Sequence, residues 1–299
     1  MKQQADKIKL INCPLCGHDS FQRFLQTRDF FLTQEDFTLD RCSRCDLVFT
    51  NPVPAGDELS AYYDSPDYLS HTSHQKSLYG VLYRFLRNIN LGKKYRMISG
   101  FKNGGNALDI GQGTGEFLNF LKGKGWKVTG IEPNEQARNF AKDHYEIESF
   151  GEEKLKDLPA GDFDLITMWH VLEHVPDLNS RMEEIKRLID RQGILLIAVP
   201  NLASPDFKMY GEKWAALDVP RHLYHFTAES MQFLLQKFNF ELIRSFPLHM
   251  DAYYVSLLSE KYRGNKFPYL KGFMNGFRSN RKASGQNNYS SMVFVAQPE

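Results

Sequence analysis

The sequence has little that would tie it to a membrane, a secretory route or a strongly charged partner. Its clearest apolar run, residues 194–199, is far shorter than the ~20 residues that a membrane-spanning helix needs. The first ten residues lack the apolar core of a signal peptide. Four cysteines would be sparse disulfide cross-linking for 299 residues, so we expect a reducing, cytoplasmic location. The net charge of +1 points to no class of partner.

The composition indicates a folded globular chain. Hydrophobic residues make up 42% and charged residues 24%, which excludes wholesale disorder. At about 150 residues per domain, the length suggests two domains.

The four cysteines form two C-x-x-C pairs, Cys13 with Cys16 and Cys42 with Cys45. Two such knuckles brought together offer the tetrahedral four-sulfur site that Zn²⁺ accepts, closed and structural. The Phe- and Leu-rich segment between the pairs predicts short strands of a zinc ribbon. Free thiols or a redox pair are the alternatives.

After residue 103 the pattern alternates short apolar runs with helical segments. We expect strands at 107–110, 127–131, 163–168 and 193–199, a final strand at 291–296, and helices at 116–122, 135–143, 177–190 and 228–237. Thr227 is a candidate N-cap for the last helix. This order predicts an α/β fold with a parallel sheet covered on both faces. Before it, Pro and Tyr residues indicate a linker, and residues 77–91 have amphipathic helical spacing.

A glycine-rich turn follows the first of these strands. Asp109 ends the strand, and Gly111, Gly113 and Gly115 lead into the next helix. In doubly wound folds a nucleotide lies across such a turn, because glycine lets the backbone approach the ligand closely. The spacing G-x-G-x-G is one residue shorter than a dinucleotide fingerprint. Glu132 at the end of the next strand is placed to accept hydrogen bonds from both ribose hydroxyls.

The segments LDIGQGTGEFL, GIEPN, FDLITMWHVLEHVPD and GILLIAVPN resemble the class I S-adenosylmethionine-dependent methyltransferases over about residues 103–245. The core also resembles ubiquinone-pathway O-methyltransferases. The cysteine module ahead of it resembles that of bacterial sugar or small-molecule methyltransferases with an N-terminal zinc-binding module. The resemblance implies a Rossmann-like sheet of seven strands, the last one antiparallel.

The resemblance also implies roles for individual residues. Asp109 and the three glycines would frame the methionine end of S-adenosylmethionine, and Glu132 would bind its ribose. The loop containing Glu153 would lie beside the adenine, and Trp169 and His170 would lie near the sulfonium and the substrate. Tyr68 would close over the cofactor or simply pack as an ordinary tyrosine.

The segment from His170 to His174 matches a zinc-peptidase pattern, H-x-x-E-H, but Pro176 stops it and the methyltransferase interpretation explains it better. Ubiquinone-pathway enzymes can hold Mg²⁺ with a similar segment. Here His170 stands where the first acid would be, so we predict no Mg²⁺ site.

A base for the methyl acceptor is expected after the fifth strand, where insertions in this fold cover the substrate. His222 and His225 lie there within a polar cluster that also contains Asp218 and Arg221. We predict that one of the two histidines deprotonates the acceptor, with His222 first; a structural histidine is the alternative for each.

We therefore divide the chain into a zinc-ribbon module at 1–55, a linker with a basic amphipathic helix at 56–102, and a methyltransferase domain at 103–299 with a substrate-covering insertion near 203–227. Residues 69–108 and 261–298 each contain seven basic and no acidic residues. If these stretches meet in space they favour an anionic substrate; otherwise they are two solvated surfaces.

The sequence thus predicts methyl transfer to an oxygen, nitrogen or carbon of a small molecule or glycan precursor. The alternative is a nucleic-acid or protein methyltransferase that uses the ribbon for recognition. It is disfavoured because the segment after the fourth strand lacks the Asn/Asp-Pro-Pro-aromatic motif of many amino-group methyltransferases. A non-enzymatic scaffold is the third hypothesis, and the intact glycine turn argues against it.

Overall fold

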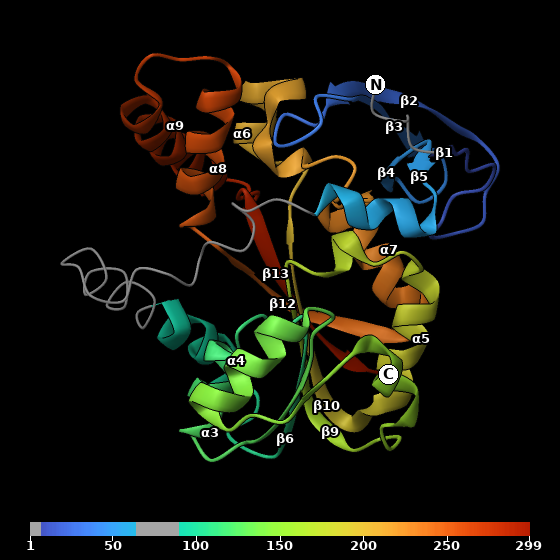
Figure 1. Cartoon of the computed structure of the whole chain (residues 1–299), viewed down its shortest axis with the longest axis vertical. Helices are drawn as coiled ribbons and strands as arrows, with labels where there is room; N and C mark the ends of the chain where they lie inside the picture. The colour runs from blue at the N-terminus through green and yellow to red at the C-terminus, as the bar shows by residue number, and fades with distance from the viewer. Residues whose placement is uncertain (1–6, 64–89) are drawn as a thin grey trace.

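The computed structural model describes residues 7–63 and 90–299. Figure 1 shows the N-terminal strands together with helices α6, α8 and α9 at one end of the molecule, and helices α3 and α4 at the other. A long mixed sheet connects the two ends. Tyr68 and most of the predicted helix at 77–91 lie outside the described residues, and residues 90–99 are helical.

The central sheet has seven strands in the order β12-β13-β10-β9-β6-β7-β8. Only β13 runs antiparallel to its neighbours, and the other pairings are parallel, as predicted for this fold class. The strands are β6 (Asn106–Ile110), β7 (Lys127–Ile131), β8 (Ser149–Phe150), β9 (Phe163–Trp169), β10 (Ile189–Pro200), β12 (Phe240–Pro247) and β13 (Ser291–Pro298).

Side-chain caps set where the sheet helices begin. The Asn134 side chain accepts a hydrogen bond from the Ala137 amide at 3.0 Å, and the Asp177 side chain caps the next helix in the same way. Thr227 caps its helix as predicted, with Ser230 completing a capping box. These helices are α3 (Glu116–Lys122), α4 (Glu135–Tyr145), α5 (Leu178–Leu188) and α7 (Ala228–Lys237). The predicted helix at 177–190 is shorter than expected because Asp177 is its cap and Ile189 already starts β10.

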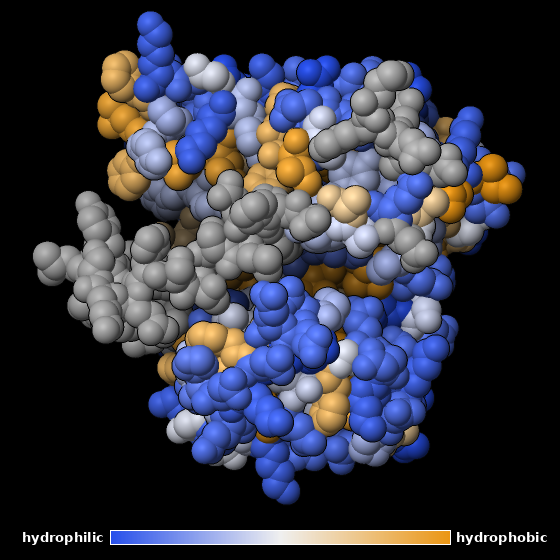
Figure 2. All heavy atoms as spheres, in the orientation of Figure 1, coloured by the Kyte–Doolittle hydropathy of each residue, from blue (hydrophilic) through white to orange (hydrophobic). Residues whose placement is uncertain are grey.

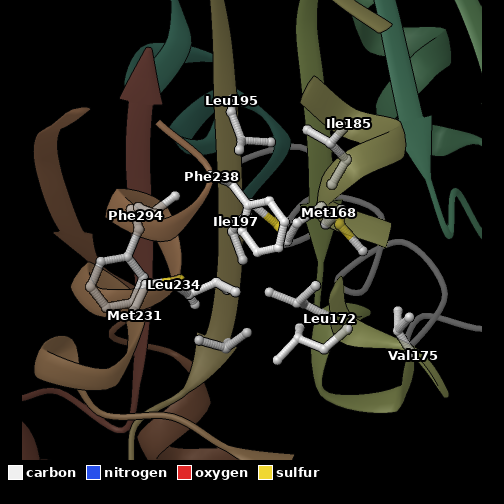
Figure 3. Packing of buried hydrophobic residues seen from close by; sticks show 14 of the residues in the cluster. Met168, Leu172, Val175, Ile185, Leu195, Ile197, Met231, Leu234, Phe238 and Phe294 are labelled. Carbon is white, nitrogen blue, oxygen red and sulfur yellow. The ribbon is translucent and has the colours of Figure 1, made fainter. Parts of the chain in front are cut away.

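Alternate residues of β10 enter two separate cores, because successive side chains of a strand point to opposite faces. Leu195 and Ile197 belong to the core beneath α5 and α7, where Figure 3 shows them between Ile185 and Leu234. Leu196 faces the core under α3 instead, with Leu118. Each such buried side chain stabilises the fold by about 1.5–3 kcal/mol.

The cysteine module builds a second sheet, and the insertion after β10 completes it. Its order is β11-β4-β3-β2, so β11 (Tyr224–His225) pairs with β4 (Val48–Thr50) although about 175 residues separate them in the chain. The predicted strands between the knuckles are β2 (Phe21–Arg28) and β3 (Asp36–Cys42). A two-stranded sheet of β1 (Lys7–Ile8) and β5 (Val53–Pro54) and a 3₁₀ helix, η1 (Gly56–Tyr62), complete the module.

Short helices make up the rest of the insertion, and a helical hairpin precedes β13. The insertion holds α6 (Pro205–Tyr210), η5 (Gly211–Lys213) and η6 (Ala215–Leu217). The hairpin consists of α8 (Asp251–Tyr262) and α9 (Pro268–Ala283), which we did not predict. The described residues also contain the 3₁₀ helices η3 (Glu152–Asp157) and η4 (Leu172–His174). Within the described residues, no helix is both long enough and apolar enough to span a membrane.

Candidate active site and metal centre

The glycine turn after β6 has the geometry that its sequence requires. Gly111, Gly113 and Gly115 have φ values of 75°, 58° and 83°, in the left-handed region that favours glycine. A Cβ on Gly111 would lie 2.3 Å from Val171 Cγ2, so any side chain at this position would also clash with Val171. A Cβ on Gly113 would meet no atom of the described residues within 4 Å. Gly113 therefore presents its backbone to open space, where a ligand can approach it.

That open space is a cavity of about 320 Å³, at the lower end of the range for small-molecule sites. It lies at the carboxyl end of β6, where ligands bind in open α/β sheets. Its lining combines polar groups with two aromatic rings: Asn90, Leu91, Lys94, Asp109, Gly111, Gln112, Gly113, Thr114, Glu116, Phe117 and Trp169.

Glu132 joins the glycine turn to the next loop. One carboxylate oxygen accepts a hydrogen bond from the Gly113 amide and the other from the Asn134 amide, both at 2.9 Å. Each oxygen keeps acceptor capacity, because a carboxylate offers about four lone-pair sites. A carboxylate held in this way can accept bonds from two neighbouring hydroxyl groups.

Asp109 is buried at the base of the cavity. Burial raises its pKa to about 7, although the positive charge of Lys94 and a hydrogen bond from Thr167 oppose the shift. The Thr167 hydroxyl lies 2.6 Å from Asp109 Oδ1. The proton occupancy of this carboxyl group therefore changes near neutral pH.

Lys94 is the only basic side chain among the described residues that line the cavity. Its ammonium lies 4.0 Å from the centre of the Trp169 ring and 5.6 Å from that of Phe117, within cation–π range. Burial lowers the pKa of Lys94, while Asp109, Asp251 and Glu116 act against that shift. The cavity thus holds a carboxyl group and an ammonium group that could receive the two charged ends of an amino acid.

His170 lies at the edge of this site between two carboxylates. Its Nε2 is 3.0 Å from Asp251 Oδ2 and its Nδ1 is 3.4 Å from Glu173 Oε1. Desolvation works against the charged ring, but the two carboxylates raise the pKa of His170 to about 10. The ring is therefore protonated at neutral pH and cannot act there as a base.

Glu173 continues the polar chain from His170 into the interior. Burial alone would raise its pKa, but His170, His222 and His174 hold it below its ordinary value. Within the described residues, its two buried oxygens have no hydrogen-bond partner apart from the ion-pair contact with His170 at 3.4 Å. Ligand atoms of Glu173, His174 and His222 lie within 4.8 Å of one another. Two imidazoles and one carboxylate suit a transition metal better than Mg²⁺.

The two predicted bases are buried in the insertion and are not among the residues that line the cavity. His222 Nδ1 lies 2.9 Å from the carbonyl oxygen of Ala216. A carbonyl only accepts, so Nδ1 carries the proton and Nε2 of the neutral ring keeps its lone pair. Among the residues that the structure describes, His225 Nε2 has no hydrogen-bond partner, and burial together with repulsion from His222 lowers the pKa of His225 to about 3. His225 is therefore neutral at pH 7.

The four cysteines meet in the N-terminal module. Their sulfur atoms lie within 4.8 Å of one another, and the Cys13–Cys45 and Cys16–Cys42 sulfur pairs are each 3.5 Å apart. Four sulfurs bound to zinc at about 2.3 Å would be about 3.8 Å apart, so the arrangement fits a tetrahedral thiolate centre. All four thiols are free, which excludes a disulfide in this structure. The hydrogen bond with Cys45 lowers the pKa of Cys13 to about 5 and raises that of Cys45.

Side chains of the sheet helices hold the first knuckle. Asn179 on α5 donates to the Pro14 carbonyl at 2.7 Å, and Lys237 on α7 donates to the Leu15 carbonyl at 2.6 Å. Leu15 itself is fully buried. The four-cysteine cluster is thus attached directly to the helices that cover the central sheet.

Arg221 links the module to the insertion from a buried position. Its guanidinium contacts Asp29 at 2.9 Å and Asp218 at 2.7 Å, and it donates to the Tyr62 carbonyl at 3.0 Å. Burial disfavours the charge, but the two carboxylates raise the pKa of Arg221 above its ordinary value. This network orders the loop that leads to His222.

The structure brings together only some of the predicted site residues. Four of the predicted residues line the cavity: Asp109, Gly111, Gly113 and Trp169. Gly115, which lies at the start of α3, packs against Ala141 instead. The exposed Glu153, in η3, has its carboxylate against Gly151, which precedes that helix. Sequence reasoning missed Lys94, Asp251 and Phe117. Lys94 lies in the basic stretch at residues 69–108. No local pattern in the sequence predicts that Asp251 contacts His170.

Comparison with known proteins agrees with this architecture. A methyltransferase-domain family matches residues 83–245. A ubiquinone biosynthesis O-methyltransferase of Glaesserella parasuis is 30% identical over 136 residues, which cover 41% of this chain and 58% of that protein. The chain thus matches a little over half the length of this curated relative.

Solved structures share the fold at low sequence identity. A geranyl diphosphate C-methyltransferase of Streptomyces coelicolor, solved with Mg²⁺, geranyl diphosphate and S-adenosylhomocysteine, has a TM-score of 0.55 at 11% identity; the match covers 82% of this chain and all of that one. A phosphoethanolamine N-methyltransferase of Haemonchus contortus has a TM-score of 0.51 at 17% identity, over 93% of this chain and 68% of that one. Since the family match covers more than half of the residues, this chain belongs to the methyltransferase-domain family.

Proposed function

We propose that this chain transfers a methyl group from S-adenosylmethionine to a small-molecule acceptor. The observation that carries the proposal is the open glycine turn beside a cavity that contains Asp109 and Lys94. Family membership and the name of the ubiquinone-pathway relative support it. That name also favours an oxygen atom as the acceptor.

In this proposal the cavity binds the amino-acid end of the cofactor by charge. Ionised Asp109 receives the ammonium group and Lys94 receives the carboxylate. Glu132 accepts from the ribose hydroxyls, and the loop with Glu153 lies beside the adenine. Trp169 and Phe117 form an aromatic wall that suits a sulfonium cation.

The cofactor supplies an activated methyl group, so the protein mainly aligns the acceptor with it. An oxygen acceptor also needs a base. We propose His222 or His225 for this role, since both have an unprotonated ring nitrogen in the neutral form and lie in the insertion that would cover the substrate. The chain His170–Glu173–His222 connects the cavity edge to these residues.

Four finer points belong to the same proposal. A glycan precursor or an anionic acceptor is supported only by the two basic stretches, and one residue of these stretches, Lys94, lines the cavity.

We further propose that Zn²⁺ is the metal of the four-cysteine centre and that it is structural, because no ligand position would stay open. We also propose a reducing, cytoplasmic compartment, because four cysteines in 299 residues would be sparse disulfide cross-linking. The domain boundaries at residues 55 and 102 and the insertion at 203–227 are part of this proposal.

Calorimetric titration with S-adenosylhomocysteine tests the cofactor site. We expect one molecule bound per chain, and at least about a tenfold loss of affinity in Asp109→Asn, because one charge-assisted contact is removed. Asp143→Asn, an exposed carboxylate on α4, is the matched control. A chain that binds no S-adenosylhomocysteine would refute the proposal and favour a non-enzymatic scaffold.

The acceptor class is tested with methyl-labelled S-adenosylmethionine and fractionated cell extract. Label in small-molecule fractions that resist nuclease and protease supports the proposal. Label that either enzyme releases favours a nucleic-acid or protein methyltransferase. Replacing both His222 and His225 with Gln should then abolish turnover at neutral pH while cofactor binding persists; full turnover would exclude them as bases.

A further inference from the structure

Helix α9 carries its large apolar side chains on the outside of the protein. Phe267, Leu270, Phe273, Met274 and Phe277 are between 43% and 67% exposed. Residues 267, 270, 274 and 277 repeat at helical spacing and so share one face. Exposed apolar side chains that gather in this way mark an interaction surface. Figure 2 shows orange side chains over the end of the molecule that α9 occupies in Figure 1.

The inner face of α9 is already used for packing. Gly272 and Gly276 are buried against α8: a Cβ on Gly272 would lie 2.6 Å from the Leu257 Cα, and one on Gly276 would lie 2.7 Å from the Tyr253 Cα. Small residues therefore hold the two helices close together. The large apolar face cannot turn inward without losing this contact.

Basic side chains flank the apolar face. Lys271, Arg278 and Lys282 repeat at spacings of seven and four residues, so they share a second face of α9. All three are exposed, as are Lys266 and Arg281. No acidic residue occurs between positions 261 and 298. The exposed surface of α9 thus combines an apolar stripe with a positive stripe, and α9 itself has no acidic side chain to offset that charge.

We propose that α9 docks this protein on an anionic lipid surface, with the apolar stripe in the headgroup boundary and the basic stripe on the lipid phosphates. A second copy fits less well, because a symmetric dimer would bring the positive stripes of both chains together. A nucleic acid would pair with the basic residues but leave Leu270 and Met274 without an apolar partner. The inference does not depend on methyl transfer, since docking needs no turnover.

Flotation of the full chain with lipid vesicles tests the proposal. We expect binding to vesicles that contain phosphatidylglycerol, little binding to pure phosphatidylcholine, and weakening when salt is raised to about 0.5 M. The variant Lys271→Glu/Arg278→Glu/Lys282→Glu should lower partitioning at least about tenfold. The control Lys142→Glu/Lys156→Glu/Lys186→Glu makes the same charge change at exposed lysines elsewhere and should retain more binding.

A second pair of variants tests the apolar stripe. Leu270→Ser/Phe277→Ser should also abolish flotation, whereas Ile8→Ser/Ile11→Ser, which alters two exposed isoleucines of the N-terminal module, should not. S-adenosylhomocysteine titration and circular dichroism show whether each variant is folded. The proposal is overturned if wild-type protein ignores anionic vesicles, or if a folded Leu270→Ser/Phe277→Ser variant floats like wild type. Dimerisation or nucleic-acid binding through α9 without vesicle binding would overturn it as well.

Discussion

The glycine-turn cavity and the histidine-rich insertion differ in how far apart their residues lie in the chain. Asp109, the three glycines and Glu132 fall within 24 consecutive residues, and one strand–turn–helix unit positions them. Arg221, by contrast, contacts Asp29 and Tyr62, more than 150 residues away. The first site is built by local geometry, whereas the second exists only when the N-terminal module and the insertion are folded together.

Loss of the proposed zinc ion should have the largest effect, and this effect should fall mainly on the N-terminal module and the insertion that folds with it. Zinc content measured by mass spectrometry should be about one per chain, and Cys13→Ser/Cys45→Ser should lose it and melt at least about 10 °C lower, because metal binding contributes folding energy. His18→Ala, next to the knuckle but outside the four-cysteine cluster, should keep its zinc. A metal-free chain of unchanged stability would contradict a structural centre.

Breaking the Arg221 network comes next. Arg221→Met should lower the free energy of unfolding by about 3–5 kcal/mol, because it leaves Asp29 buried without its countercharge. Urea denaturation measures the change. Arg28→Met, which removes an exposed arginine that pairs with Asp36, should change stability little. Equal losses in the free energy of unfolding would show that burial does not make the Arg221 ion pairs more important for stability than the exposed Arg28 pair.

In the cavity, pH should modulate cofactor affinity through Asp109. Its pKa is raised to about 7, and only the ionised form can pair with an ammonium group. Affinity for S-adenosylhomocysteine should therefore approach its full value about one pH unit above 7 and fall by up to about tenfold per unit below 7. Calorimetry at several pH values measures this slope, and Asp109→Asn should flatten it. A slope that persists in Asp109→Asn would assign the titration to another group.

The smallest expected effect concerns Lys94. Lys94→Met should weaken S-adenosylhomocysteine binding by about fivefold, because a single charged contact is lost while the apolar stem is kept. Lys93→Met, at the exposed neighbouring position, is the control and should bind normally. Equal affinities in both variants would show that Lys94 only packs on Trp169.

Much of the fold could be predicted because its signals are local. The predicted strands and sheet helices from β6 to α7 are confirmed within a few residues, and the Thr227 cap is confirmed. The hairpin of α8 and α9 was missed. Its packed face consists of small residues such as Gly272 and Gly276, and its large apolar residues face outward, so hydrophobic periodicity alone gives no clear account of it.

The residues of the candidate site also divide into those predicted from local sequence and those brought together only by tertiary packing. The sequence alone determined the strand, the three glycines, Glu132 and the paired cysteines, because each depends on spacing within a short segment. Only the tertiary structure decided that Asp251 reaches His170, that His222 joins Glu173 and His174, and that β11 completes the sheet of the cysteine module. These contacts join segments far apart in the chain, so they depend on how whole elements pack and leave no local pattern in the sequence.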